Sequence, residues 1–410
     1  MSAILDHKPQ TISGAPARIN IEKMFPGGIF AGIIGVVICL VILLTSNGAT
    51  KTAIAGSYLF SWIFWLTLTL GCFGLLMFYH LIRGRWMLPQ LRLLEAGASV
   101  PLLIVMFLLF LPLAIGVLLH QTYLYAWVSP TLLRTSHQLQ LKSPYLNVGG
   151  WFTRYIIWFV SWIAISAGFK ASTKRQEKSG DLKELILRNN WAAAAFIWFA
   201  LSITFAMVDW VMAVDWRWFS ELFGLWTIVQ VGLGAYAFTV LIVCSNEDKE
   251  DYKPFITPDM TRDFGVILFV FAMLWAYTSF SQFLIIWSGN LPETNFYYVE
   301  RSKMGWDIVG LITMVGEYFI PFIALLTPRN RKIPRNLAII AGFMFVIHIV
   351  DVYQYVLPAL RHNGPMPTGF DVLTFISIGL LWLGVFAAVL RQDNLMPKFD
   401  LRLQEENHGH

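Results

Sequence analysis

Apolar runs long enough to cross a lipid bilayer constrain this sequence more than any other feature. A helix needs about 20 predominantly apolar residues to cross the hydrocarbon core. Ten runs meet this requirement, at residues 28–45, 58–82, 98–119, 150–168, 191–213, 218–244, 262–287, 303–327, 335–357 and 369–390. Of the 410 residues, 57% are hydrophobic and 13% are charged, whereas soluble domains carry about 25% charged residues. The sequence therefore predicts an all-α membrane protein with about ten transmembrane helices.

Lysine and arginine are distributed unevenly between the loops, and this distribution predicts the orientation of the chain. The terminal segments and the loops on their side hold 22 of the 30 basic residues, while the loops on the other side hold 7. Cytoplasmic loops of membrane proteins carry such an excess. We therefore expect residues 1–27 and 391–410 to be cytoplasmic segments that flank a membrane domain over 28–390. Because the basic residues lie in short loops, the net charge of +5 does not indicate nucleic-acid binding.

Three sequence features predict how the spans are connected and packed. The basic loop 169–190 predicts helix groups at about 28–170 and 185–390. Gly28 and Gly32 place small residues on one helical face, which allows close contact with another helix. The polar start of the chain lacks the pattern of a cleaved signal peptide, so we expect the first span to remain.

The sequence gives no sign of a redox metal held by this chain. The three cysteines lie inside apolar runs without a CxxC pair, so we expect buried thiols rather than cluster or haem c ligands: Cys39, Cys72 and Cys244. A membrane haem needs two histidines at one depth. The candidates have three different depths: His80, His120 and His348. We therefore expect no metal site and no covalently bound cofactor.

Ionisable side chains inside the apolar runs mark candidate functional sites, because charge is costly in a bilayer. Glu317 lies near the middle of the eighth span, roughly 20 Å from either end at about 1.5 Å per residue. His348 and Asp351 share one face of the ninth span, and a histidine beside a carboxylate can hold a proton near neutral pH. With Asp209 and Asp307, these residues form the predicted proton path. Satisfied structural pairs are the alternative.

Other polar and aromatic residues in the outer half predict contacts to a quinone or to a polar cavity. These candidates are Gln282, Trp287, Gln354 and Tyr355. We expect the outer-half residues to converge at one depth: Asp209, Gln282, Asp307, His348, Asp351 and Gln354.

The stretch 275–306 predicts a helix that leaves the bilayer and turns along its surface. Gly289 permits a left-handed turn, and Pro292 prevents the helix from resuming at once. Asp215 and Glu221, in the turn between the fifth and sixth spans, are expected to reach water or to pair with Arg217.

Residues 280–293, which include Trp287, Gly289 and Pro292, resemble the signature of a membrane subunit of bacterial alternative complex III. That subunit is of the ActF type and belongs to the NrfD-like family, which includes the polysulfide reductase membrane subunit. Residues 209–212 and 218–220 are similar to the same family, although the sister subunit ActC shares the first piece. The chain departs from the family pattern at Glu221, where a small hydroxyl residue is common.

The resemblance implies a fold, a function and a set of partners. The fold would be two four-helix bundles with extra helices. The function would be that of a non-haem subunit of a quinol:electron-acceptor (cytochrome c) oxidoreductase in the bacterial inner membrane. Menaquinone or another quinone would bind mainly to the sister subunit ActC, while this subunit would carry a proton path. Haem c and iron–sulfur clusters would lie on periplasmic partner subunits, which pass electrons to cytochrome c or to a terminal oxidase.

Three other functions fit the same residues. Ten helices with buried carboxylates also suit a stand-alone secondary transporter, although neither paired broken helices nor internal symmetry is evident in the sequence. A quinone-binding anchor of a polysulfide-reductase-like molybdoenzyme is a second alternative. A purely structural membrane anchor, with the polar groups as satisfied core pairs, is a third.

Overall fold

The computed structural model describes residues 27–82, 84–181 and 183–397, and all regular structure within them is helical. Ten helical units are long and apolar enough to cross a membrane: α1 (Gly27–Thr45), α2 (Gly48–Ile82), α4 (Val100–Leu118), α7 (Val148–Ser179), α8 (Lys183–Trp210), α9 (Phe223–Cys244), α10 (Pro258–Gly289), α12 to α13 (Trp306–Leu326), α15 (Pro334–Val356) and α16 (Gly369–Leu390). Each coincides with a predicted span, so the predicted all-α, multi-pass membrane protein is confirmed. The expected N-terminal segment, apart from Gly27, and residues 398–410 of the expected tail lie outside the described residues.

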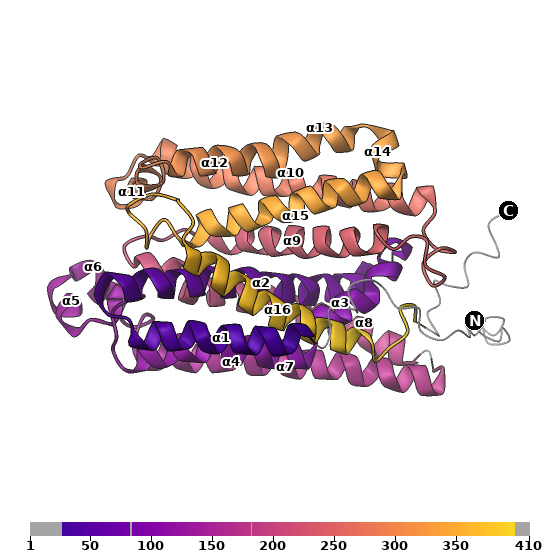
Figure 1. Cartoon of the computed structure of the whole chain (residues 1–410), viewed down its shortest axis with the longest axis horizontal. Coiled ribbons are helices and arrows are strands. Elements are labelled where there is room, and N and C mark those ends of the chain that lie inside the picture. The colour runs from indigo at the N-terminus through magenta and orange to yellow at the C-terminus, as the bar shows by residue number, and fades with distance from the viewer. Residues whose placement is uncertain (1–26, 83, 182, 398–410) are drawn as a thin grey trace.

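The spanning helices form two four-helix bundles (Figure 1). In the first bundle, α2 packs on α4, α4 on α7, α7 on α8, and α8 again on α2. In the second, α9 packs on α10 and α15, and the α12 to α13 unit closes the ring between α10 and α15. The division between helix groups that we expected in the loop 169–190 therefore falls one helix later. The reason is that α8 packs on α7 and α2 and so completes the first ring of four helices, although it also contacts α9.

The two bundles meet along α2 and α9, and both helices are almost entirely buried. The first and last spans, α1 and α16, pack on each other over this seam (Figure 1). Their contact confirms the expectation for the two glycines of α1. A Cβ atom on Gly32 would lie 2.4 Å from the backbone nitrogen of Leu381, and one on Gly28 would lie 2.9 Å from the carbonyl oxygen of Leu380.

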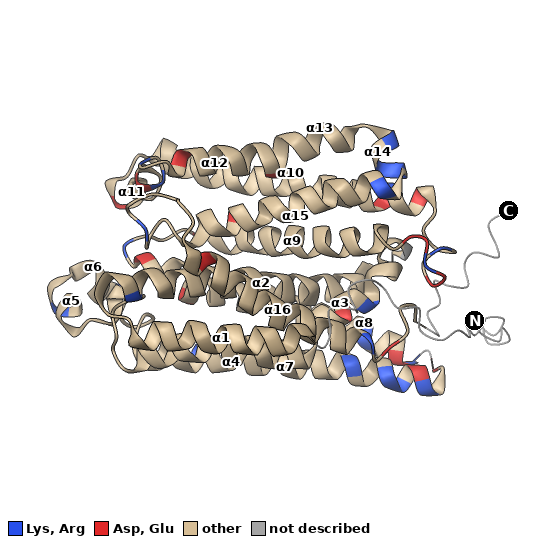
Figure 2. Ribbon diagram, in the orientation of Figure 1, with Lys and Arg blue, Asp and Glu red and all other residues tan. Residues whose placement is uncertain are grey.

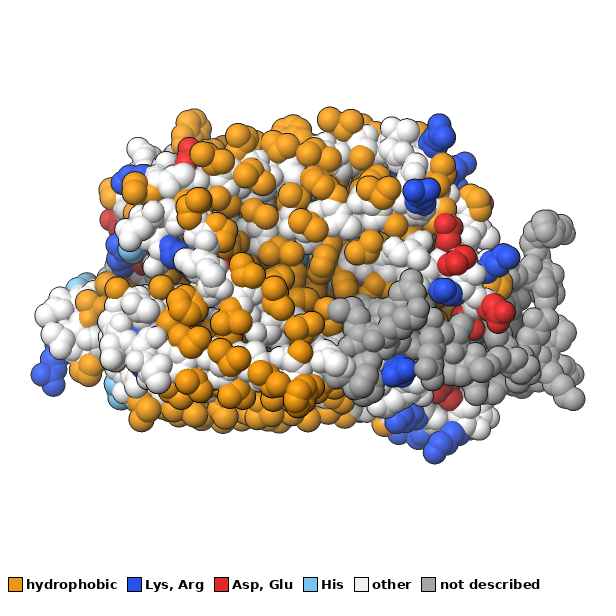
Figure 3. Space-filling view, in the orientation of Figure 1, with side chains coloured by type: hydrophobic (Ala, Val, Ile, Leu, Met, Phe, Trp, Pro, Cys, Tyr) orange, Lys and Arg blue, Asp and Glu red, His pale blue; other side chains and the backbone are white. Residues whose placement is uncertain are grey.

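Charged residues gather at the two ends of the bundles and leave an apolar belt between them (Figures 2 and 3). We call the end that carries α3 (Leu91–Gly97) and α14 (Pro328–Lys332) the basic end, because most of the lysine and arginine residues that the structure describes lie there. The opposite end carries α5 (Pro130–Thr135), α6 (His137–Lys142) and α11 (Pro292–Arg301). With ten spans, the described chain enters and leaves the membrane domain at the basic end.

The turn after α10 differs in one detail from its prediction. Gly289 is the last residue of α10, and the left-handed residue is Asn290, with φ 44°. Asparagine tolerates this conformation because its short polar side chain can bond locally. Pro292 then opens α11 at a position where its missing N–H is not needed.

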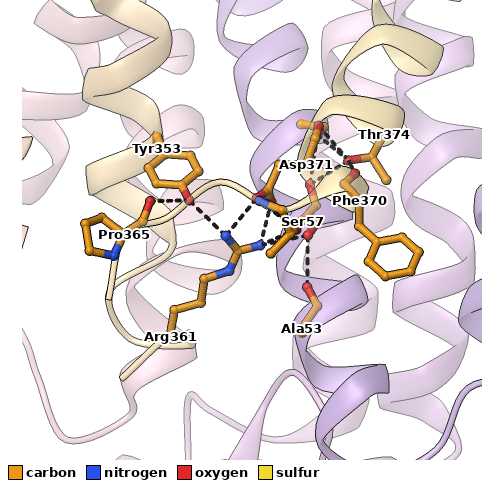
Figure 4. Close-up of polar contacts among 10 residues, drawn as sticks. Ala53, Ser57, Tyr353, Arg361, Pro365, Phe370, Asp371 and Thr374 are labelled. Atoms are coloured by element: carbon orange, nitrogen blue, oxygen red, sulfur yellow. Dashed lines mark hydrogen bonds and ion pairs between the residues drawn. The ribbon is translucent and has the colours of Figure 1, made fainter. Parts of the chain in front are cut away.

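At the opposite end, Arg361 connects three helices through its guanidinium group (Figure 4). Its two terminal nitrogens donate to the carboxylate of Asp371 at the start of α16, over 2.7 and 2.5 Å. They also donate to the hydroxyls of Ser57 on α2 and Tyr353 on α15. The Arg361–Asp371 pair is largely buried and bidentate. It therefore fixes the positions of α2, α15 and α16 relative to one another at this end of the molecule.

Candidate functional site

Three ionisable side chains meet inside the second bundle, away from both ends. Glu317 lies in the α12 to α13 unit, and His348 and Asp351 lie on α15. Their relative exposures are 0%, 0% and 3%. One oxygen or nitrogen atom from each lies within 4.8 Å of the others, and His348 Nδ1 is 3.8 Å from Glu317 Oε1. The structure therefore brings together three of the five residues of the predicted proton path.

A break in helical geometry places Glu317. Residues Val315–Phe319 form a π-helical turn, named η5, between α12 (Trp306–Met314) and α13 (Ile320–Leu326). Such a turn inserts one extra residue into the helix and often marks a functional site.

Close packing of α9 against α15 places His348. A Cβ atom on Gly234 of α9 would lie 2.3 Å from His348 Nε2. Only glycine therefore leaves room for the imidazole at this position.

Two residues that the sequence analysis did not identify hold Asp351 in place. Gln230 of α9 donates its side-chain amide to Asp351 Oδ2 over 2.7 Å, and the indole N–H of Trp275 on α10 donates to the same oxygen over 3.0 Å. Gln230 is a buried amide within a long apolar span, so the depth argument applied to the acids would have identified it. Trp275 carries no such signal, because tryptophan is common in this chain.

Several polar atoms of the cluster are buried and lack a hydrogen-bond partner among the described residues. They are both carboxylate oxygens of Glu317, both ring nitrogens of His348 and the side-chain oxygen of Gln230. Buried polar atoms in folded proteins are nearly always paired, and an exception calls for an ordered water, an ion or a catalytic role. A buried carboxylate is also costly unless it is protonated or paired. The cluster is therefore suited to hold a proton and a few water molecules.

A metal ion fits the same three side chains less well. A histidine that binds a metal usually donates its second ring nitrogen to a carboxylate, a carbonyl or water, which fixes the ring. Neither nitrogen of His348 has such a partner among the described residues. The nearest carboxylate, that of Glu317, is too far away at 3.8 Å to accept a hydrogen bond.

Asp209, the fourth predicted residue, does not belong to this cluster. It lies in the first bundle, where Arg154 of α7 donates to both of its oxygens over 2.8 and 2.7 Å. The guanidinium carbon of Arg154 also lies 3.8 Å from the centre of the Tyr145 ring. The expected convergence of Asp209 with His348 and Asp351 is therefore wrong, because similar depth on two helices does not place them in one bundle.

The remaining candidates scatter around the opposite end. Asp307 and Trp287 are exposed, so neither lines the cluster. Gln282 is buried and accepts a hydrogen bond from the Ser220 hydroxyl. Gln354 is half-buried beside Gly310 of α12.

Tyr355 lies one turn beyond Asp351 on α15, and its hydroxyl is 2.5 Å from that of Thr227. The predicted polar set therefore divides into one buried cluster and several separate contacts.

The smaller predictions agree with the structure. Arg217 pairs with Asp215 over 2.8 Å, and Glu221 is exposed, so each carboxylate has one of its two expected environments. Arg217 also pairs with Glu300 of α11. The cysteines are buried and free, as predicted: Cys39, Cys72 and Cys244.

One charged network at the basic end was not predicted. Arg92 of α3 bonds to Glu95 on the same helix and to Glu177 of α7.

We compared the chain with models of protein families and with curated proteins, and neither comparison gives a match.

Proposed function

We propose that this chain is a proton-handling membrane subunit of a quinol:electron-acceptor oxidoreductase of the alternative complex III type. The observation that carries the proton role is the buried cluster of Glu317, His348 and Asp351 with its unpaired polar atoms. Ionisable groups inside a membrane domain are retained mainly where they move ions or protons. A proton donor and acceptor are most effective when their proton affinities lie near the working pH, and burial beside other titratable groups can achieve this.

The resemblance of residues 280–293 to ActF-type subunits supports the choice of complex. Two four-helix bundles with α1 and α16 outside them agree with the fold that this resemblance implies. In this proposal the protein lies in a bacterial inner membrane with its basic end in the cytoplasm. The NrfD-like sister subunit ActC binds the quinol, and periplasmic iron–sulfur and haem c subunits receive the electrons.

A proton-coupled secondary transporter is the second candidate, and one observation favours it. The π-helical turn η5 interrupts a spanning unit beside buried ionisable groups, and transporters often build their sites from interrupted helices. Gentle solubilisation and affinity purification distinguish the two functions. The proposed subunit should co-purify with haem c and iron–sulfur polypeptides, whereas a transporter should be recovered alone or as copies of itself. Recovery with a molybdenum-containing subunit would instead indicate the polysulfide-reductase-like anchor.

The proton role is tested with Glu317→Gln and Asp351→Asn in the assembled complex. Each variant keeps the side-chain shape but removes a titratable group, so proton release per quinol should fall while the complex still assembles. Asp307→Asn is the matched control, because Asp307 lies on α12 but is exposed. Unchanged proton release in both assembled cluster variants would refute the role.

A further inference from the structure

The interior of the second bundle changes in character on the two sides of the cluster. Toward the opposite end, its buried side chains are polar or carry a polar group. They are Thr227 and Gln230 of α9, Trp275, Thr278 and Gln282 of α10, and Tyr355 of α15. Toward the basic end, three helices bury only apolar side chains next to the cluster. These side chains are Phe264, Leu268 and Ala272 of α10, Leu325 of α13, and Leu337, Ala341 and Met344 of α15. On α9, Tyr236 and Thr239 are buried on this side, and the Thr239 hydroxyl donates to Gln90.

Hydrogen bonds mark successive levels of the polar half. Gln230 and Trp275 hold Asp351 at the first level. Thr227 and Tyr355 bond at the next, one helical turn farther along α15. Ser220 and Gln282 bond over 2.5 Å at the third level.

On α15, the cluster lies nearer to the opposite end than to the basic end, whereas Glu317 is nearly central in the α12 to α13 unit. Asp351 is five positions from the end of α15 at Val356, which corresponds to about 8 Å along the helix. In the other direction, His348 is fourteen positions from the start of α15 at Pro334, or about 21 Å. A charge in such an apolar passage is strongly disfavoured, so a proton that leaves by this second route meets a far higher barrier.

We infer that the cluster exchanges protons with water only at the opposite end, and that the hydroxyl of Tyr355 relays protons along this route. The inference rests on the proposed proton role. A proton that leaves a carboxyl group of the cluster leaves one negative charge behind. The hydroxyl of Tyr355 accepts a proton from water on the cluster side as it donates its own proton to water on the outer side, so it passes one proton outward and stays neutral. The apolar side chains of α10, α13 and α15 toward the basic end seal the cluster on that side.

Silver ions can test this route, since they enter narrow water-filled passages and react with thiols. The native cysteines of the assembled complex are first replaced by alanine. A single cysteine is then introduced in each of two variants, Thr278→Cys and Leu268→Cys. Both positions lie on α10 and are almost fully buried, but they lie on opposite sides of the cluster level. Silver is added from one side of oriented vesicles. The cysteine that has not reacted with silver is then alkylated and quantified by mass spectrometry.

When silver is added at the opposite end, we expect it to protect the cysteine of Thr278→Cys from alkylation. This protection should be several-fold faster than the protection of the cysteine of Leu268→Cys by silver added at either end. Gln282→Cys provides a second reporter in case Thr278→Cys fails to assemble. Equal protection of Leu268→Cys from the basic end would overturn the inference. So would the absence of protection at both reporters in the polar half.

A separate variant tests the role of the Tyr355 hydroxyl in this route. Tyr355→Phe removes the hydroxyl but keeps the ring, which stacks on Phe223 with centroids 5.1 Å apart. Proton release during turnover should become several-fold slower. Tyr353→Phe is the control, because its hydroxyl bonds to Pro365 and Arg361 instead. Equal rates for the two variants would remove Tyr355 from the route.

The outcomes separate this inference from the proposed function. Silver access through the polar half combined with unchanged proton release in Glu317→Gln would support the route and refute the proton role. Reduced proton release in Glu317→Gln with silver access from the basic end would support the proton role and refute the route.

Discussion

At the scale of single residues, the cluster depends on positions where one atom decides the arrangement. His348 occupies space that any side chain at Gly234 would fill. Asp351 is held by Gln230 and Trp275, whereas the carboxylate of Glu317 has no hydrogen-bond partner among the described residues. The site is therefore fixed on one side and free to bind a proton or water on the other.

Gly234→Ala tests the packing of the imidazole. The added Cβ atom would lie 2.3 Å from His348 Nε2, so the ring must move away from α9. Overpacking of this kind costs about 1–3 kcal/mol, so we expect a lower melting temperature in detergent and reduced proton release. Gly342→Ala is the control, because its nearest neighbour, a methyl group of Leu241, would be at 3.4 Å. Similar behaviour of the two variants would contradict the packing argument.

Asp371→Asn tests the connection made by Arg361. The exposures of the two side chains are 10% and 5%, so the variant leaves a largely buried cation without its charged partner. Breaking a buried pair in this way costs about 3 kcal/mol, which should lower the melting temperature markedly. Asp259→Asn removes an exposed partner of Arg262 and should change stability by less than about 1 kcal/mol. Equal melting temperatures would show that Arg361 does not connect the three helices.

At the scale of elements, short segments between the spanning helices carry charged side chains that bond to the spans. The pKa of Glu95 on α3 illustrates this. Burial disfavours the charged carboxylate, but the nearby charges of Arg92, Lys170 and Arg188 outweigh burial and lower the pKa of Glu95 below its ordinary value. A short helix between two spans is therefore attached to the first bundle by charge.

Acid should weaken this attachment. Because the pKa of Glu95 is lower in the folded than in the unfolded state, its contribution is fully present above the unfolded value of about 4.3. The contribution is lost as the pH falls through the lower folded value. Hydrogen exchange of α3 should therefore accelerate below about pH 4, and Glu95→Gln should show fast exchange at neutral pH as well. Slow exchange of α3 in Glu95→Gln at neutral pH would argue against the charged attachment.

At the scale of the whole molecule, one end of the protein is basic and the other is not, with an apolar belt between them (Figures 2 and 3). This asymmetry predicts the orientation in the membrane. The same asymmetry gives the proton route its direction, since the polar half of the second bundle faces the end with fewer basic residues. Orientation and proton release are therefore linked in one prediction.

Cysteine labelling in intact cells measures the orientation. Thr135→Cys, on α5 at the opposite end, should react with a membrane-impermeant maleimide. Ser179→Cys, at the basic end of α7, should react only after the cells are permeabilised. Both positions are exposed, so a difference reflects the side of the membrane rather than burial. The reversed pattern would place the basic end outside.

Local sequence was enough to predict the ten spans, the basic end and the depths of Glu317, His348 and Asp351. These properties depend on local composition and on a fixed rise per residue, so they can be read along the chain. Packing between helices was needed to show that α8 belongs to the first bundle, that Asp209 pairs with Arg154, and that Gln230 and Trp275 hold Asp351. The physical reason is that residue number fixes the height of a side chain in the membrane. Helix rotation and the choice of neighbouring helix are fixed by packing between segments far apart in the sequence.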